Sequence, residues 1–425
     1  SKGDFYDDDE LSDLLSLHEA LTINGEDGSG DGRDGGGQVD GEDDGLDFDP
    51  FPVKKPDDGP PSPDAFSIPG IHDLVLRTVR EIDDVGEKTP APADAAARSP
   101  VATVNNPALL AGAKPTVRAI ATDVDGTLLH GGKRIHPITE RAVLRAIDAA
   151  YGDGRRGEKN ANTTTTLEHF FVATGKSRRG AMLSLPDSVG DRLPSMPGVY
   201  IQGLYCVGRD GSTVVFERKL PASAVAATER LADELGLSVV GYDGDVLLST
   251  DLTGPVVSLS EYYGEPTVEI AADGEGNPIR LSEHGPGLHK LLVMDDDVGR
   301  LAPARERLEE LFAPGDDDDD DGSEGETREG RCTITQALPT MLEVLPFGCG
   351  KGLGVRKVCD SLGIDVESEL MALGDAENDA DMLGAAAIGI AVGNACPAAR
   401  EGADLVMEAG NDEGGAGVAI ELFGL

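Results

Sequence analysis

The chain has 425 residues, enough for two or three domains, and its 79 Asp and Glu against 36 Lys and Arg give a net charge of −43. Because like charges repel, this balance argues against nucleic acid and anionic membrane surfaces as partners. No stretch approaches the ~18 to 20 consecutive apolar residues that a membrane helix needs, so we expect a soluble protein.

The five cysteines are widely spaced, odd in number and without a C-x-x-C pair. This arrangement argues against a disulfide framework and against a thiolate zinc site. We therefore expect a reducing compartment such as the cytoplasm. The first residue is Ser rather than Met, and no targeting signal can be read from the residues that follow it.

Residues 1–114 are rich in Gly, Pro and acidic residues, as in "GDGRDGGGQVDGEDDG". This composition buries too little apolar surface to offset the entropy of ordering, so we predict a mostly disordered acidic region whose protein partner is unknown. Two short stretches, "ELSDLLSLHEAL" and "IHDLVLRTVREI", place apolar residues at helical spacing. They are expected to dock on the protein's own core or on a partner.

A different pattern covers residues 115–220. The run "TVRAIATDVDGTLL" predicts a buried parallel strand that ends in an acidic turn. A helix in "TERAVLRAIDAA" and a second strand in "HFFVATGKS" follow, which together form a right-handed parallel unit. The stretch "GVYIQGLYCVGRDGSTVVFERKL" predicts a third strand that continues into a hairpin at the edge of the sheet.

Residues 221–342 predict a separate α+β module with an acidic insertion, Asp316 to Asp321, near its end. Its helices are expected in "SAVAATERLADELG" and "RLAPARERLEELF", and its strands in "LSVVGYDGDVLLST", "HKLLVMD", "CTITQA" and "TMLEVLP". Over residues 343–425, helices and strands alternate again. The fold class that follows is α/β, a doubly wound parallel sheet interrupted by an inserted domain.

Four polar pieces lie at predicted strand ends, where open α/β sheets bind their ligands. The first contains Asp123 and Asp125. Because the two carboxylates are one residue apart on a strand end, they point the same way, and one can attack while the other transfers protons. The second contains Thr174 and Gly175, where a hydroxyl and a helix N-terminus can bind phosphate, although an ordinary helix cap is the better explanation of this piece taken alone.

The third piece is Lys351, a lysine among glycines that is suited to neutralising phosphate charge. It does not belong to a nucleotide P-loop, because Gly352 stands where that motif needs Ser or Thr. The fourth piece, "GDAEND", includes Asp375 and Asp379 and is suited to a hard cation such as Mg²⁺, with a capped turn as the alternative.

The order and content of these pieces, D-x-D-G-T, T-G, Lys and G-D-x-x-N-D, resemble the four motifs of the haloacid dehalogenase (HAD) superfamily. The insert between the second and third pieces resembles the C2-type cap of Cof-type (subfamily IIB) phosphatases. The ending, "VGNACPAAREGAD" with "NDEGGAGVA", is also similar to that group. The resemblance covers about residues 115–425 and implies a HAD-like Rossmannoid core.

The resemblance implies catalytic roles for the two aspartates of the first piece. Asp123 would attack phosphorus to form an aspartyl phosphate, and Asp125 would serve as general acid and then as general base. Magnesium would be held by the Asp123 carboxylate, the Asp125 backbone carbonyl and Asp375.

The other matching positions are implied to bind phosphate and to support the metal. Thr174, Gly175 and Lys351 would bind phosphoryl oxygens. Asn378 and Asp379 would organise the metal-bound waters and Lys351.

Two positions depart from the pattern of the Cof-type group. Lys176 stands where many members have Arg, and Gln202-Gly203 stands where they have Asn-Gly, so contacts near the leaving group are expected to differ. The "QGL" version and the acidic low-complexity insertions resemble plant and algal proteins, which implies a plastid location.

The presence of Asp125 favours phosphoryl transfer over dehalogenation, because only the former needs an acid at that position. We expect a Mg²⁺-dependent phosphatase acting on a small phosphorylated metabolite: a sugar phosphate first, with pyridoxal phosphate or FMN next. One alternative is a phosphomutase of the same superfamily. The other is a non-catalytic binding or regulatory protein that keeps the fold.

Overall fold

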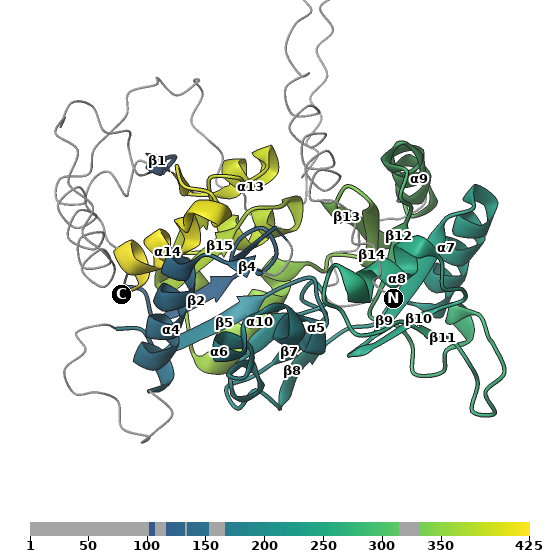
Figure 1. Ribbon diagram of the computed structural model, residues 1–425, viewed down its shortest axis with the longest axis horizontal. Coiled ribbons are helices and arrows are strands. Elements are labelled where there is room, and N and C mark those ends of the chain that lie inside the picture. The colour runs from purple at the N-terminus through teal and green to yellow at the C-terminus, as the bar shows by residue number, and fades with distance from the viewer. Residues whose placement is uncertain (1–101, 107–115, 132–133, 153–165, 314–330) are drawn as a thin grey trace, which may run out of the picture. The chain divides into compact units, whose positions relative to one another are not determined.

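The computed structural model describes residues 102–106, 116–131, 134–152, 166–313 and 331–425 (Figure 1). The two predicted N-terminal helices, most of the region predicted to be disordered and the acidic tract Asp316 to Asp321 lie outside these ranges. Within the described ranges, no helix is long and apolar enough to cross a membrane.

Nine of the described strands form the main sheet, in the order β1-β17-β16-β15-β2-β5-β6-β7-β8. Their bounds are β1 (Ala102–Val104), β17 (Leu405–Met407), β16 (Ile388–Ala391), β15 (Leu370–Gly374), β2 (Ala119–Thr122), β5 (His169–Ala173), β6 (Gly198–Tyr200), β7 (Tyr205–Val207) and β8 (Val214–Glu217). The strands from β17 to β6 are parallel, whereas β1 pairs antiparallel with β17 at one edge, and β7 pairs antiparallel with β6 and with the other edge strand, β8. The central strands are fully buried, as their continuous apolar runs predict.

Alternate residues of the central strands pack on helices of opposite faces, which makes the sheet doubly wound. Ile120 of β2 belongs to a core shared with helices α4 (Pro137–Tyr151) and α14 (Gly415–Ala419). Its neighbour Ala121 belongs to a second core shared with α10 (Lys351–Leu362) and α12 (Ala380–Ala385). The predicted α/β fold class is therefore confirmed.

The two sequence halves of this sheet are interleaved at its centre. In Figure 1 the blue strand β2 and the yellow-green strand β15 lie side by side, although the inserted domain separates them in sequence. Leu373 of β15 pairs with Thr122, and Val172 of β5 pairs with Thr122 on the other side. Three of the four predicted pieces, those that follow β2, β5 and β15, therefore lie together at the carboxyl ends of neighbouring parallel strands.

Strand β1 was not predicted, because it lies inside the region 1–114 that was expected to be mostly disordered. It pairs with β17 through residues such as Val104 and Leu405. The side chain of Asn105 donates to the backbone carbonyl oxygens of Arg400 and Ala403, both at 3.0 Å. Three residues are too few to show an apolar period, so only this tertiary pairing makes the strand visible.

We call Ala222–Pro346 the inserted domain. Its described strands form a six-stranded sheet in the order β11-β10-β9-β12-β14-β13. The strands are β9 (Ser238–Asp243), β10 (Val246–Ser249), β11 (Glu269–Ile270), β12 (Lys290–Met294), β13 (Cys332–Leu338) and β14 (Met341–Pro346), and the helices are α7 (Ala222–Leu235), α8 (Gly254–Glu261) and α9 (Val298–Leu311). Helices α7 and α9 share one apolar core with β9, β12 and β14.

The boundary that we predicted after residue 342 lies too early. Strand β14 continues in the smaller sheet to Pro346, because Glu343 and Val344 pair with both β12 and β13, and Leu345 and Pro346 pair with β13. The inserted domain therefore joins the second half of the main sheet only a few residues before Lys351, which begins α10.

Candidate active site

Asp123 and Asp125 follow β2 but differ in their exposure. The backbone N–H of Asp123 donates to the carbonyl of Leu373 at 2.9 Å, which fixes the start of the turn. The side chain of Asp123 is 5% exposed and that of Asp125 is 49% exposed. The buried carboxylate is thus held rigidly, while the other one can meet a leaving group or water.

Lys351, the first residue of α10, joins two buried carboxylates. Its Nζ donates to Oδ1 of Asp123 at 2.5 Å and to Oδ1 of Asp379 at 2.6 Å. Burial by itself lowers the pKa of Lys351, but the charges of Asp123 and Asp379 outweigh it and raise that pKa above its ordinary value. The lysine is therefore a permanent cation at the end of β2.

Asp123, Asp375 and Asp379 form a compact acidic group. One carboxylate oxygen from each lies within 4.8 Å of the others. Burial raises the pKa of Asp123 to about 7, although the charge of Lys351 opposes this shift. Burial, and after it the charges of Asp123 and Asp379, also raises the pKa of Asp375 well above its ordinary value. A hard divalent cation fits this oxygen-donor set, because it would compensate the excess negative charge.

Glycine at position 126 makes room for this group. Its φ is +81°, and a Cβ atom there would lie 2.2 Å from Oδ2 of Asp375. The hydroxyl of Thr127 donates to the other oxygen of Asp375 at 2.6 Å. The D-x-D-G-T turn therefore shapes the position of a carboxylate from a different strand.

Asp379 uses both of its oxygens for protein contacts. One accepts from Lys351, and the other accepts from the backbone N–H groups of Asp375 at 2.9 Å and Ala376 at 3.0 Å. Its neighbour Asn378 donates from Nδ2 to Oε1 of Gln202 at 3.0 Å. The Oδ1 atom of Asn378 is buried and has no hydrogen-bond partner among the described residues, so it is a free acceptor at the site.

Thr174 leaves β5 next to the end of β2. Its hydroxyl is buried and accepts from the backbone N–H of Lys176 at 3.2 Å. The cap of helix α5 (Arg178–Ser184) is instead Ser177, whose Oγ accepts from the N–H of Gly180 at 2.9 Å. The helix-cap alternative for Thr174 is therefore wrong, and its hydroxyl closes the turn before the helix.

The turn after Thr174 is contacted by the inserted domain. Ser177 donates from its backbone N–H and from its hydroxyl to the two oxygens of Glu265, at 3.1 and 2.6 Å. The N–H of Arg179 donates to Oδ1 of Asp245 at 2.7 Å. Two carboxylates of the inserted domain thus satisfy backbone donors at the start of α5.

Lys176 and Gln202 belong to the site, although the sequence marked them only as departures from the Cof-type pattern. The Nζ of Lys176 lies 3.2 Å from Oδ2 of Asp125 and also donates to the carbonyl of Tyr263. Lys176 therefore links the more exposed carboxylate of the first piece to the inserted domain. In the sequence, only their positions pointed to the site: Lys176 stands directly after T-G, and Gln202 stands directly before Gly203.

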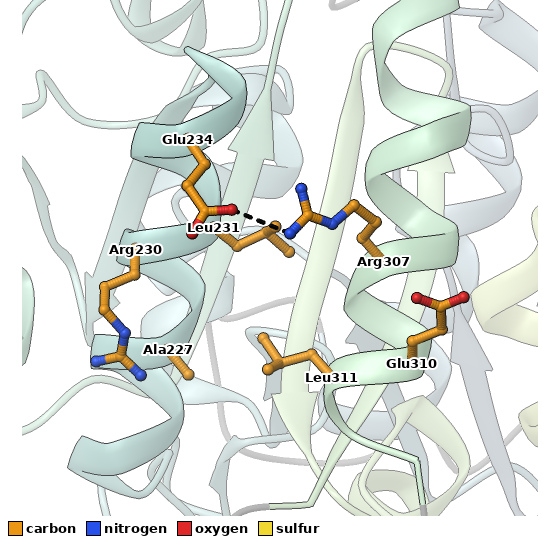
Figure 2. Close-up of a pocket in the computed structure, with 7 residues that line it drawn as sticks. All are labelled: Ala227, Arg230, Leu231, Glu234, Arg307, Glu310 and Leu311. Carbon is orange, nitrogen blue, oxygen red and sulfur yellow. Dashed lines mark hydrogen bonds and ion pairs between the residues drawn. The ribbon is translucent and has the colours of Figure 1, made fainter.

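A cavity of about 310 Å³ lies elsewhere, between helices α7 and α9 (Figure 2). It is lined by Ala227, Arg230, Leu231, Glu234, Arg307, Glu310 and Leu311. Figure 2 shows the ion pair of Glu234 and Arg307 across it, with a 3.0 Å separation. No predicted site residue lines this cavity, so it is not the candidate active site.

Comparison with known proteins identifies the family. Residues 120–420 match the family model of haloacid dehalogenase-like hydrolases. The chain is 36% identical over 301 residues to a Streptococcus pyogenes protein named as a phosphatase, covering 70% of this chain and 96% of that protein. A solved HAD subclass IIB sugar phosphatase shares the fold, with a TM-score of 0.53 and 20% identity over 72% of this chain and 99% of that one.

A relative from Arabidopsis thaliana, named as the chloroplastic endoribonuclease YBEY, is 31% identical over 315 residues. The match covers 73% of this chain but only 47% of that protein, so this chain spans about half of its length. The predictions of a HAD-type hydrolase, of its Rossmann-like fold and of a phosphatase-type enzyme are confirmed at the level of the family. The chain belongs to the haloacid dehalogenase-like hydrolases.

Proposed function

We propose that this chain is a magnesium-dependent phosphatase that hydrolyses a small phosphorylated metabolite through an aspartyl phosphate on Asp123. The observation that carries the proposal is the contact of a buried nucleophile with a buried cation, Asp123 Oδ1 to Lys351 Nζ at 2.5 Å, beside Asp375 and Asp379. Such an arrangement places positive charge where a transferring phosphoryl group develops negative charge.

In the first step, a carboxylate oxygen of Asp123 attacks phosphorus and the bond from phosphorus to the ester oxygen breaks. Asp125 donates a proton to the departing oxygen, and its partial exposure supports this role. In the second step, Asp125 takes a proton from water, which attacks the aspartyl phosphate. Inorganic phosphate leaves and the carboxylate of Asp123 is regenerated.

The remaining residues would bind and orient the phosphoryl group. Thr174 and the backbone of Gly175 would contact its oxygens, and Lys351 would balance its charge. Mg²⁺, held by Asp123, Asp375 and the backbone carbonyl of Asp125, would supply further charge neutralisation for the transferring group. Asn378 and Asp379 would position water and Lys351 around it, a role that the free Oδ1 of Asn378 supports.

For the substrate we propose a sugar phosphate first, and pyridoxal phosphate or FMN next. The fold shared with a subclass IIB sugar phosphatase supports the general class, and the inserted domain, a C2-type cap in this proposal, would select the leaving group. A plastid location is proposed as well, supported by the chloroplast name of the Arabidopsis relative.

Released phosphate measured over a panel of phosphorylated metabolites with Mg²⁺ tests this proposal. We expect release from a sugar phosphate, and none in the Asp123→Asn variant, which keeps the shape but lacks the nucleophile. Interconversion of phosphate esters without net release would indicate the phosphomutase instead. A folded protein that forms neither product would indicate the binding or regulatory alternative.

A further inference from the structure

Lys290 and Glu343 form a buried ion pair inside the inserted domain. Lys290 lies in β12 and Glu343 in the neighbouring strand β14, and Nζ lies 2.5 Å from Oε1. The two side chains are only 3% and 5% exposed. A buried pair of this kind gives little net stability compared with two apolar side chains, because both charges lose their hydration. Stability alone therefore does not explain why this ion pair is buried at this position.

Lys290 contacts the main domain at the predicted phosphate-binding turn. Its Nζ donates to the carbonyl oxygen of Gly175 at 2.8 Å and lies 4.6 Å from the centre of the Tyr242 ring. The carbonyl belongs to the residue directly after Thr174. One end of the ion pair thus fixes the peptide that follows the predicted phosphate ligand.

Glu343 contacts the site from the other side. Its second oxygen accepts from Nε2 of Gln202, and Oε1 of Gln202 accepts from Nδ2 of Asn378 at 3.0 Å. Glycine at position 175 permits this approach, since a Cβ there would lie 2.6 Å from Nε2 of Gln202. The ion pair is therefore hydrogen-bonded, directly or through Gln202, to both the second and the fourth pieces of the site.

The backbone that presents Gln202 is strained. Ile201 and Gln202 have φ values of +52° and +57°, and they are the described residues other than glycine with positive φ. A β-branched residue rarely adopts this conformation, which persists only where the surroundings impose it. Here the surroundings include the side-chain contacts of Gln202 with Glu343 and Asn378 and its backbone N–H bond to the carbonyl of Thr174 at 3.1 Å.

We propose that the Lys290–Glu343 pair is a positioning device that holds the Thr174 turn and Asn378 in place when the inserted domain is seated on the main sheet. This inference rests on the proposed phosphatase function. Both residues act through others, Lys290 through Gly175 and Glu343 through Gln202, and neither is assigned a contact with the substrate. Turnover then depends on the seated inserted domain, which also supplies the contacts to Lys176 and Ser177.

The test replaces both charges at once, by Lys290→Met with Glu343→Leu, so that no unpaired charge is buried. The fold is expected to survive, because buried pairs can be exchanged for apolar residues. The matched control makes the same exchange in an exposed pair of the inserted domain, Arg307→Met with Glu234→Leu, which lines the cavity between α7 and α9 (Figure 2) and contains no candidate site residue.

Hydrogen–deuterium exchange gives the readout that does not depend on activity. In the double variant, amides of residues 174–180 and 201–204 are expected to exchange at least about tenfold faster, while strands β2 and β15 keep their protection. kcat is expected to fall about tenfold or more, with a smaller change in KM, because the pair does not touch substrate. The control pair should change neither quantity.

Unchanged exchange at both segments in the folded double variant would overturn the inference, whether or not the protein releases phosphate. If the wild type shows no phosphatase activity, the proposed function fails and the exchange result still decides whether the pair positions these segments. Should the double variant not fold, Gln202→Gly serves instead, because glycine relieves the positive φ while removing the link to Asn378. Undiminished kcat in that variant would also overturn the inference.

Discussion

Lys351 Nζ lies 2.5 Å from Asp123 Oδ1, and both side chains are almost fully buried. The pair brings together the end of β2 and the start of α10, which the whole inserted domain separates in sequence. Because Lys351 also contacts Asp379, it is the cation that the acidic group depends on when no metal is bound.

Replacing Lys351 by Met should lower kcat/KM by about 10²-fold or more, since a preorganised charge at the transferring group is lost. Steady-state kinetics with Mg²⁺ measures this loss. Lys357→Met is the matched control, because Lys357 lies exposed on the same helix. If the two variants had equal activity, Lys351 would have no role in the mechanism.

Gly126→Ala should weaken Mg²⁺ binding and turnover, because the new Cβ would lie 2.2 Å from Oδ2 of Asp375 and must displace it. Gly244→Ala is the control that separates backbone strain from steric collision. Gly244 has a φ of +60°, but a Cβ there would meet nothing within 4 Å. The control should lose about 1 kcal/mol of stability in urea and keep its activity. A Gly126→Ala variant with unchanged Mg²⁺ affinity would contradict the proposed ligand geometry.

Lys176→Met should lower kcat about tenfold, because Asp125 loses the ammonium group 3.2 Å away that orients it. Lys176→Arg keeps a cation at this position and should retain most of the activity. The comparison is made with one good substrate at saturating Mg²⁺. If the Met and Arg variants behave alike, the charge of Lys176 does not matter for Asp125.

The raised pKa of Asp123, about 7, predicts a pH-dependent stability in the absence of metal. A folded-state pKa above the unfolded value means that the folded state binds a proton more tightly, so ionisation destabilises the fold as pH rises from about 4 to about 7. With EDTA present, Asp123→Asn should therefore raise the melting temperature, and more so at pH 7 than at pH 4. A gain of equal size at both pH values would contradict the raised pKa of Asp123.

Three of the four pieces could be predicted because each depends on a local pattern, an apolar strand followed by polar residues, and the remaining one, Lys351, because it stands among glycines at the start of a helix. Such a pattern carries no information about side chains that meet the site from another domain. Lys290 begins a strand and Glu343 lies within an apolar one, so each looks like an ordinary polar residue until β12 and β14 are placed against Gly175 and Gln202. Strand β1 was missed for a different reason, because its three residues are too few to show an apolar period.

The proposed mechanism requires that Asp123 becomes phosphorylated during turnover. Acid-quenching the enzyme with substrate and Mg²⁺, followed by peptide mass spectrometry, measures this directly. We expect one phosphoryl group on the peptide that contains Asp123, lost on treatment with hydroxylamine and absent from Asp123→Asn. Phosphate on a different residue, or steady turnover by Asp123→Asn, would contradict it.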